Sequence, residues 1–465
     1  MLKIYNTLSR KIEQFKPITP GQVGVYSCGP TVYDYQHIGH MRRYVGDDVL
    51  VRVLKANGYN VKHVMNITDV GHLVSDSDSG EDKMEKGAKK FGMSVWDIAK
   101  KFEQQFFDSC KELNITRPNE VMHATDYINE QIQLIKTLEE KGYTYKTPDG
   151  IYFDSTRFSN YFTLSRQNPE DLKAGARVDM VEGKKHPTDF ALWKFTPSET
   201  RRQMEWESPW GIGFPGWHIE CSAMAMKALG ETIDIHTGGI DHINIHHTNE
   251  IAQSEAASGK PFVHFWIHHG FLQVQGEKMS KSLGNFYTVE DIQQHGFHPR
   301  TLRYLYLQTH YRQEMNFTWD ALRSAETAVH RLIDSISKWE SKEGEADAAV
   351  VREFMHALND DLNAPKGLSI LWDLVRSDRS MSRKAATVLQ LDKILGLDLQ
   401  QSRDQEVPVK YEIVPEEVQN LVNEREELRK EKKFHLADQL RDKIKKLGYE
   451  VIDGEKMTTV EKIKG

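Results

Sequence analysis

Apolar positions in the first part of the chain alternate between strand-like runs and helical spacing. Apolar runs at Val23–Cys28 and Val61–Ile67 predict buried strands. Between them, the spacing over Arg42–Asn57 predicts a helix that Gly58 ends. The order strand, helix, strand indicates an α/β domain built on a parallel sheet.

Two further helical stretches, Trp96–Glu112 and Asp126–Lys141, precede a change of pattern at about residue 143. From there to about residue 210, short aromatic runs separated by polar turns predict strands at Tyr143–Tyr145, Ile151–Asp154 and Phe190–Phe195. The α/β pattern then returns, with a predicted helix at Trp217–Leu229 and buried strand material at Phe262–Val274. We interpret the aromatic region as an insertion between two halves of one parallel sheet.

The last third of the chain is predicted to be mainly helical. Residues 320–398 give long helical stretches, with Asn363–Pro365 as the main interruption. Gln400–Pro408 is a polar linker. Beyond it, Glu416–Leu447 predicts one highly charged helix that Gly448 ends, followed by a strand at Tyr449–Asp453.

Length and composition describe an ordinary multidomain protein. The chain has 465 residues, of which 39% are hydrophobic and 28% charged, so about two to four domains are expected. Met1–Pro20 lacks an apolar segment of signal-peptide length, and Phe262–Val274 is too short to span a bilayer. We therefore predict a cytoplasmic location and no membrane partner.

The net charge and the cysteine content limit which partners and which cysteine roles are expected. A net charge of −7 argues against indiscriminate nucleic-acid binding, whereas residues 421–465 carry 12 Lys and Arg against 10 Asp and Glu. That mild local excess also suits a solvated helix face. The three cysteines are too few and too scattered for a disulfide framework, so they are buried, catalytic or metal-binding.

Two short segments carry the clearest chemical signal. His37-Ile-Gly-His40 follows a predicted strand and opens a helix, and Lys278–Ser282 lies in a loop bounded by glycines. His37 and His40 share one helical turn and can donate to phosphate oxygens, while Gly39 leaves room for a nucleotide. Lys278 and Lys281 can stabilise a leaving pyrophosphate. In this order the two segments resemble the paired motifs of class I aminoacyl-tRNA synthetases, which activate an amino acid with ATP.

A second group of residues suggests a metal. Cys28 and Cys221 could join His246 and Glu250, which are four residues apart and share a helix face. Two thiolates, an imidazole and a carboxylate suit Zn²⁺ in a tetrahedral site. No Cys-x-x-Cys spacing supports that set, so spacing alone leaves two core cysteines as the alternative. Cys110 is interpreted as a core residue of its helix.

Longer segments make the resemblance specific. The chain resembles the cysteinyl-tRNA synthetase family from residue 1 to about 320, and the helical remainder fits that family in order and length. The segments that carry the resemblance are Tyr5–Leu8, Cys28–Tyr33, Asn66–Asp69, Phe190–Lys194, Gly216–Met224 and Asn249–Glu255.

The resemblance implies a zinc site and an amino-acid pocket. Zinc held by Cys28, Cys221, His246 and Glu250 would bind the substrate thiol and discriminate against serine without an editing site. The residues implied for the cysteine pocket are Gly29, Thr68, Trp217, His236 and Asp241. On type alone, the tryptophan could also be a core aromatic. The chain departs from the family pattern at Val70–His72, Phe214, His242, Ile245 and Thr248, none of which is an implied ligand.

The same resemblance implies an α/β fold with a class I Rossmann-type catalytic domain, an inserted connective domain, a helical bundle and a small C-terminal tRNA-binding domain. The expected divisions are 1–115 and 206–275 for the two catalytic halves, 116–205 for the insertion, 276–319 for the lysine-loop and stem-contact region, 320–400 for the bundle and 408–465 for the anticodon-binding domain.

Three functions fit these motifs to different degrees. The first is a cysteine–tRNA ligase that uses ATP with Mg²⁺, one zinc per chain, L-cysteine and tRNA(Cys), and acts as a monomer. The second is a related cysteine ligase of the mycothiol-pathway type, and the third is a non-catalytic tRNA- or effector-binding paralogue. The intact motifs and the charged tail favour the first. Phosphate contacts in the tail are expected from Lys430, Lys432, Lys433, Lys443 and Lys445.

Overall fold

The computed structural model describes residues 1–71, 82–168, 182–197, 202–280, 283–337, 339, 344–400, 416–430, 433–453 and 458–463. Within these residues, no helix is long and apolar enough to cross a membrane. The predicted linker Gln400–Pro408 lies outside the described residues, except for its first position.

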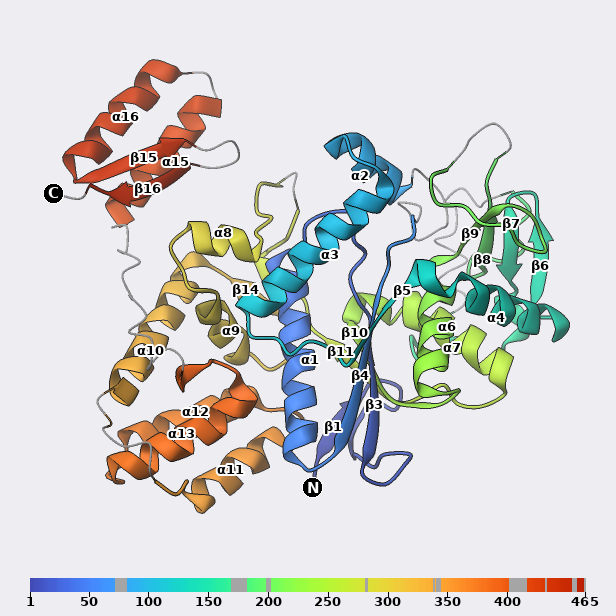
Figure 1. Ribbon diagram of the computed structural model, residues 1–465, viewed down its shortest axis with the longest axis horizontal. Helices are drawn as coiled ribbons and strands as arrows, with labels where there is room; N and C mark the ends of the chain where they lie inside the picture. The colour runs from blue at the N-terminus through green and yellow to red at the C-terminus, as the bar shows by residue number, and fades with distance from the viewer. Residues whose placement is uncertain are drawn as a thin grey trace.

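A parallel sheet of five strands forms the centre of the molecule (Figure 1). Its strands, in spatial order, are β11 (Val263–His269), β10 (Ile233–Gly239), β3 (Gln22–Ser27), β4 (Asn60–Ile67) and β5 (Glu120–His123). All four neighbouring pairs are parallel. The strand order runs outward from β3 in both directions, so β3 and β10 flank the point where it reverses. Ligands of open α/β sheets bind beyond the carboxyl ends of strands at such a point.

Helices cover both faces of this sheet because successive strand residues point to opposite sides. Val25 packs into the core that contains Met41 of α1, whereas Tyr26 packs into the cluster that contains Met224 of α6. Figure 1 accordingly shows α1 on one side of the sheet and α6 and α7 on the other. The helices around the sheet are α1 (Ile38–Ala56), α2 (Lys83–Phe91), α3 (Val95–Glu112), α6 (Trp217–Leu229) and α7 (His246–Ser258).

The predicted insertion is a separate antiparallel sheet between β5 and α6. Its strands are β6 (Thr144–Thr147), β7 (Gly150–Phe153), β8 (Phe190–Phe195) and β9 (Gly213–Pro215), in that spatial order. Helix α4 (Ile128–Glu140) precedes them and packs on α6 and α7. The aromatic strands therefore form a unit of their own, and helix α4 packs this unit against the helices of the central sheet.

The apolar run Phe262–Val274 is divided between two sheets. Its first part is β11 and its second is β12 (Leu272–Val274), with Gly270 between them. Strand β12 pairs with β13 (Glu277–Lys278) and with β14 (Met315–Phe317), while α8 (Val289–Gln294) and α9 (Pro299–Leu307) follow the lysine segment. A Cβ on Gly270 would lie 2.4 Å from the Gln313 carbonyl oxygen, so only glycine fits where the chain leaves the central sheet.

The helical prediction for residues 320–398 is confirmed. Asn363 caps α12 by accepting a hydrogen bond from the Lys366 N–H, and Pro365 occupies its first turn. The helices are α10 (Trp319–Ser337), α11 (Ala348–Leu358), α12 (Ala364–Arg376) and α13 (Met381–Leu395). A short hairpin at the other end of the chain, β1 (Lys3–Asn6) and β2 (Lys11–Gln14), contacts β11.

The prediction of a single helix over Glu416–Leu447 is wrong. The structure has two helices, α15 (Glu416–Lys430) and α16 (Phe434–Lys446), followed by the hairpin β15 (Tyr449–Asp453) and β16 (Thr458–Lys462). Lys433, before α16, has a non-helical backbone. The break lets Val418 and Val422 pack against Ile444, and this burial outweighs the helical propensity of the charged run.

Candidate active site and metal centre

A cavity of about 670 Å³ opens at the carboxyl ends of β3 and β10. It is the position that the strand order predicts for a ligand. Its lining includes Gly29, His37, His40, Trp217, Asp241 and Lys278, which come from segments far apart in the sequence. The structure therefore brings the histidine segment, the lysine segment and most of the predicted cysteine pocket to one cleft.

The histidine segment forms the start of α1. His37 is the N-cap residue, and its Nδ1 accepts a hydrogen bond from the His40 N–H at 3.2 Å. The two rings stack with centroids 3.5 Å apart. Solvent reaches the His40 side chain, but the protein atoms packed around it, followed by the nearby His37 and Arg43, hold its pKa below the usual range. A Cβ on Gly39 would lie 3.0 Å from the His37 ring, so a larger residue would crowd the stacked pair.

The lysine segment reaches the same cleft. Lys278 ends β13 with an exposed side chain and lines the cavity together with Met279. Asn285 holds the loop closed: its Oδ1 accepts from the Ser280 N–H at 2.7 Å, and its Nδ2 donates to the Lys278 carbonyl at 3.2 Å. Lys281, the second predicted cation, lies outside the described residues.

The predicted metal ligands meet in the wall of this cleft. Cys28 follows β3, Cys221 lies on α6, and His246 and Glu250 lie one turn apart on α7. One ligand atom from each of the four lies within 4.8 Å of the others, and all four side chains are buried. His246 Nε2 is 3.0 Å from Glu250 Oε1.

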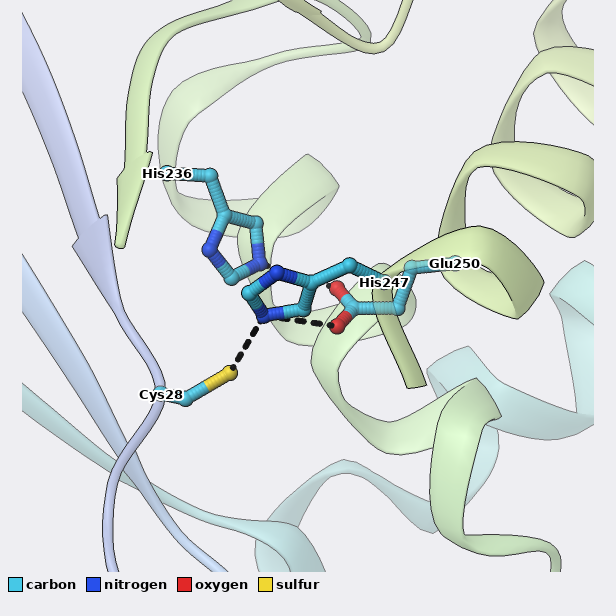
Figure 2. A group of neighbouring side chains, drawn as sticks. All are labelled: Cys28, His236, His247 and Glu250. Atoms are coloured by element: carbon cyan, nitrogen blue, oxygen red, sulfur yellow. Dashed lines mark hydrogen bonds and ion pairs between the residues drawn. The ribbon is translucent and has the colours of Figure 1, made fainter. Parts of the chain in front are cut away.

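A second group of possible ligands overlaps the first. Cys28 and Glu250 also meet His236 and His247, again within 4.8 Å of one another (Figure 2). His247 Nε2 lies 3.3 Å from Cys28 Sγ, and His236 Nε2 lies 2.9 Å from Glu250 Oε2. Sequence reasoning missed His247, although the adjacent pair His246-His247 was a visible signal. His236, assigned to the cysteine pocket, is fully buried behind Glu250 and is not among the described residues that line the cavity.

The protonation of the two thiols differs strongly. Burial opposes ionisation of Cys28, but a hydrogen bond from Cys221 and the imidazoles of His247 and His236 bring its pKa well below the usual value. The hydrogen bond with Cys28, together with burial, raises the pKa of Cys221 well above it. A thiolate and the Glu250 carboxylate are thus buried side by side, where a cation would balance their charge. This donor set fits zinc.

Outer hydrogen bonds fix the orientation of these imidazoles. His246 Nδ1 lies 2.9 Å from His218 Nδ1. His247 Nδ1 lies 2.8 Å from His268 Nε2, whose Nδ1 lies 2.8 Å from the Thr7 hydroxyl. Such partners set the tautomer and the ring direction of ligating histidines.

The cysteine-pocket residues line the cavity beside the ligands. Gly29 donates its N–H to Asn66 Oδ1 at 2.7 Å, and Asn66 Nδ2 donates to Thr68 Oγ1 at 3.1 Å. A Cβ on Gly29 would lie 1.4 Å from the Asn66 carbonyl oxygen, so only glycine fits. Trp217 is half-buried, and its ring centroid lies 4.3 Å from that of His246. The tryptophan is therefore part of the cavity wall rather than a core aromatic.

The departures from the family pattern leave the four ligands in place. The Arg202 guanidinium lies 3.4 Å from the centroid of the Phe214 ring. Thr248 Oγ1 donates to the Ile243 carbonyl at 2.7 Å. His242 lines the cavity with its Nδ1 3.4 Å from His247 Nε2, and Ile245 is the exposed residue before α7.

Comparisons with known families divide the chain into three matched parts. The tRNA synthetases class I (C) catalytic domain matches residues 14–327. The DALR domain matches residues 353–400, and the cysteinyl-tRNA ligase anticodon binding domain matches residues 413–460.

Relatives with full-length similarity carry one activity in their names. The chain is 49% identical to cysteine–tRNA ligase 1 of Burkholderia lata, covering 97% of this chain and 95% of the relative. It is 45% identical to cysteine–tRNA ligase of Treponema denticola, covering 99% and 100%. The corresponding protein of Thermococcus gammatolerans is 40% identical, covering 100% and 99%.

Solved structures agree in fold. Methionyl-tRNA synthetase of Mycobacterium tuberculosis, in complex with methionyl-adenylate, matches with a TM-score of 0.54 and 15% identity, covering 81% of this chain and 90% of that one. Agrobacterium radiobacter LeuRS, in a ternary complex with tRNA and LeuAMS, matches with a TM-score of 0.58 and 13% identity, covering 85% and 86%. The predicted class I synthetase fold is confirmed.

Proposed function

Because the chain belongs to the cysteine–tRNA ligase family and charges tRNA(Cys) with cysteine in an ATP-dependent reaction, we propose that both steps take place in the cleft beyond β3 and β10. One observation carries this assignment. Two thiols, an imidazole and a carboxylate converge within 4.8 Å in the wall of the cavity that the histidine and lysine segments also line.

Cys28, Cys221, His246 and Glu250 would hold one Zn²⁺. When bound, the zinc offers a coordination position to the substrate thiolate, which is a far better ligand than the hydroxyl of serine. The protein's own contribution is rigidity, since His246 and Glu250 lie on one face of α7 and neighbouring imidazoles fix their direction. Gly29, Thr68, Trp217 and Asp241 would shape the pocket, and His236 would support it through Glu250.

In the first step a carboxylate oxygen of cysteine attacks the α-phosphorus of ATP, which enters with Mg²⁺. A bond forms between that oxygen and phosphorus while the bond to pyrophosphate breaks. His37 and His40 donate to phosphate oxygens as charge builds up, and Gly39 lets the nucleotide approach. Lys278 and Lys281 stabilise the departing pyrophosphate.

In the second step a terminal ribose hydroxyl of the tRNA attacks the carbonyl carbon of the adenylate and AMP leaves. By resemblance to class I enzymes, the attacking group is the 2′-hydroxyl.

The tRNA would contact the C-terminal unit at its anticodon end. Lys433, Lys443 and Lys445 are exposed, as phosphate contacts require. Lys432 and the side chain of Lys430 lie outside what the structure describes. We propose the same six divisions of the chain as the sequence predicts, with residues 408–465 as the anticodon-binding domain.

The chain is proposed to act as a monomer in the cytoplasm. All described residues of the cleft and of the donor set come from one chain, so no second copy is needed to complete them. Free cysteine ligands such as Cys28 and Cys221 also suit a reducing compartment.

The test is cysteine-dependent exchange of pyrophosphate into ATP, measured beside charging of tRNA(Cys). The proposal expects exchange with cysteine, none with serine at equal concentration, and charging of the 3′ end. Comparable exchange with serine would contradict the proposed thiol-binding centre.

A further inference from the structure

Arg43 is a cation of the cleft to which the proposed reaction assigns no role. It lies on α1, three residues after His40, and lines the same cavity. Among the described lining residues, Arg43 and Lys278 are the Lys and Arg side chains. Lys278 belongs to the exposed hairpin β12–β13, whereas Arg43 projects from the helix toward the metal-ligand set.

One hydrogen bond fixes the position of the Arg43 guanidinium. Its Nη2 donates to the backbone carbonyl of Cys28, the candidate ligand at the end of β3. The guanidinium carbon lies 4.2 Å from the centroid of the Tyr44 ring, which supports it from the side. The positive charge is therefore held beside the site that would bind the substrate thiol.

The other end of the guanidinium lacks a partner. Nη1 is shielded from solvent, and no described group accepts a hydrogen bond from it. Two acids, Asp47 and Asp241, lie near enough to act on its charge. Asp47 Oδ1 pairs with His269 at 2.9 Å, and neither acid accepts a hydrogen bond from Nη1. An unpaired buried donor is costly, more so on a charged group, and in the wall of a ligand cleft the natural remedy is an acceptor on the ligand.

We propose that Arg43 binds the α-carboxylate of the substrate cysteine through Nη1, which deepens and rests on the function proposed above. Cysteine is a short molecule, so a thiol held by zinc beside Cys28 and Cys221 leaves its carboxylate within reach of a guanidinium that is hydrogen-bonded to the Cys28 carbonyl. Nη1 is the nitrogen that has no protein acceptor, so we place the contact there. One carboxylate oxygen is oriented while the other stays free to attack phosphorus.

The alternative acceptor is the α-phosphate of ATP. His37, His40 and Lys278 line the cavity and are already proposed to serve the phosphates, so we assign the carboxylate to Arg43. Guanidinium groups match carboxylates well in geometry and stay charged at all working pH values.

The test compares ligands with and without a carboxylate. Dissociation constants of L-cysteine, cysteamine and ATP are measured by calorimetry on the zinc-loaded full chain, for wild type and for Arg43→Met. Loss of one charged hydrogen bond should weaken L-cysteine about 10- to 100-fold and leave cysteamine and ATP within about 2-fold. Arg43→Lys should recover part of the loss, and Lys55→Met, at the exposed end of the same helix, is the matched control.

Other outcomes are decisive as well. Equal weakening of L-cysteine and cysteamine would reduce Arg43 to a structural role, and a loss confined to ATP would assign it to phosphate; either overturns the inference. Arg43→Gln, which keeps a neutral amide donor on the side chain, gives the same comparison if the methionine variant misfolds. Zinc content is measured for every variant. Zinc should tighten the binding of L-cysteine and of cysteamine to the wild type. If zinc changes neither affinity, the proposed metal centre is contradicted, rather than the role of Arg43.

Discussion

The Glu250 side chain shows how much chemistry depends on single residues in this cleft. Its carboxylate is fully buried, with Oε2 2.9 Å from His236 and Oε1 3.0 Å from His246. A buried carboxylate is tolerated only with such partners. The sequence could predict His246 and Glu250 as one helical face, but joining them to Cys28 and Cys221 relied on the family resemblance, because spacing alone favoured two core cysteines.

Residues adjacent in sequence were the hardest to assign. His246 and His247 each belong to one of the two overlapping sets of possible metal ligands. Arg42 and Arg43 differ in what they contact, although the two side chains are chemically identical. Arg42 donates to the carbonyls of Gly270 and Phe271 at 2.8 Å each, tying α1 to the turn before β12. Which neighbour faces the cleft depends on how the helix is docked, and a single sequence does not contain that information.

Lys278 provides a test at this scale. Replacing Lys278 with Ala should lower kcat for pyrophosphate exchange about 100-fold, because the ammonium group is proposed to act on the leaving group. The KM for cysteine should change less than about 2-fold. Lys260→Ala, on the exposed turn between α7 and β11, serves as the control. A Lys278 variant with normal kcat and poor cysteine affinity would assign the loop to another task.

At the scale of elements, the local patterns predicted most helices and strands. Trp217–Leu229 was predicted with the bounds observed, because its apolar spacing is a local signal. The break between α15 and α16 was missed because residues 431–433 contain neither Gly nor Pro. There the helix ends so that apolar residues of both arms can pack, which is a tertiary effect.

Helix α10 carries a testable buried acid. Glu326 is 6% exposed, and burial raises its pKa to about 7 from 4.5. Since the folded value is the higher one, wild type has its full stability below pH 4.5 and loses part of it as the pH rises through 7. Glu326→Gln cannot ionise, so between pH 5 and pH 8 it should gain about 1–2 kcal/mol in unfolding free energy relative to wild type.

Urea unfolding at several pH values measures this difference. Glu353→Gln, at an exposed position of α11, is the control and should show no such trend. A constant difference between wild type and the Glu326 variant across this range would show that Glu326 does not titrate there.

At the scale of the whole molecule, the order of parts followed from the sequence, because strand, insertion and helical patterns change sharply along the chain. The cleft could not be predicted in the same way. Its lining includes Gly29, Trp217 and Lys278, which the strand order of the sheet brings together beyond β3 and β10. The topology of the fold places such distant residues together. In the sequence, only the pairing of the histidine and lysine segments indicated that they share a site.

Truncation after Pro408 tests the separation of catalysis from tRNA recognition. The described cleft residues all precede this point, so cysteine-dependent exchange should persist. Charging of tRNA(Cys) should fall about 100-fold in kcat/KM because the second contact with the same tRNA is lost. Anticodon-altered tRNA should then be charged no worse than the normal one. Normal charging by a folded truncated chain would show that the tail is not a recognition module.

Metal analysis of purified protein tests whether Cys28, Cys221, His246 and Glu250 hold one zinc. Cys221 belongs only to this set and His247 only to the overlapping one. We expect about one zinc per chain in wild type, in His247→Gln and in the core control Cys110→Ser, and a loss of most zinc in Cys221→Ser. Equal zinc in wild type and Cys221→Ser, or its loss from His247→Gln alone, would contradict the account.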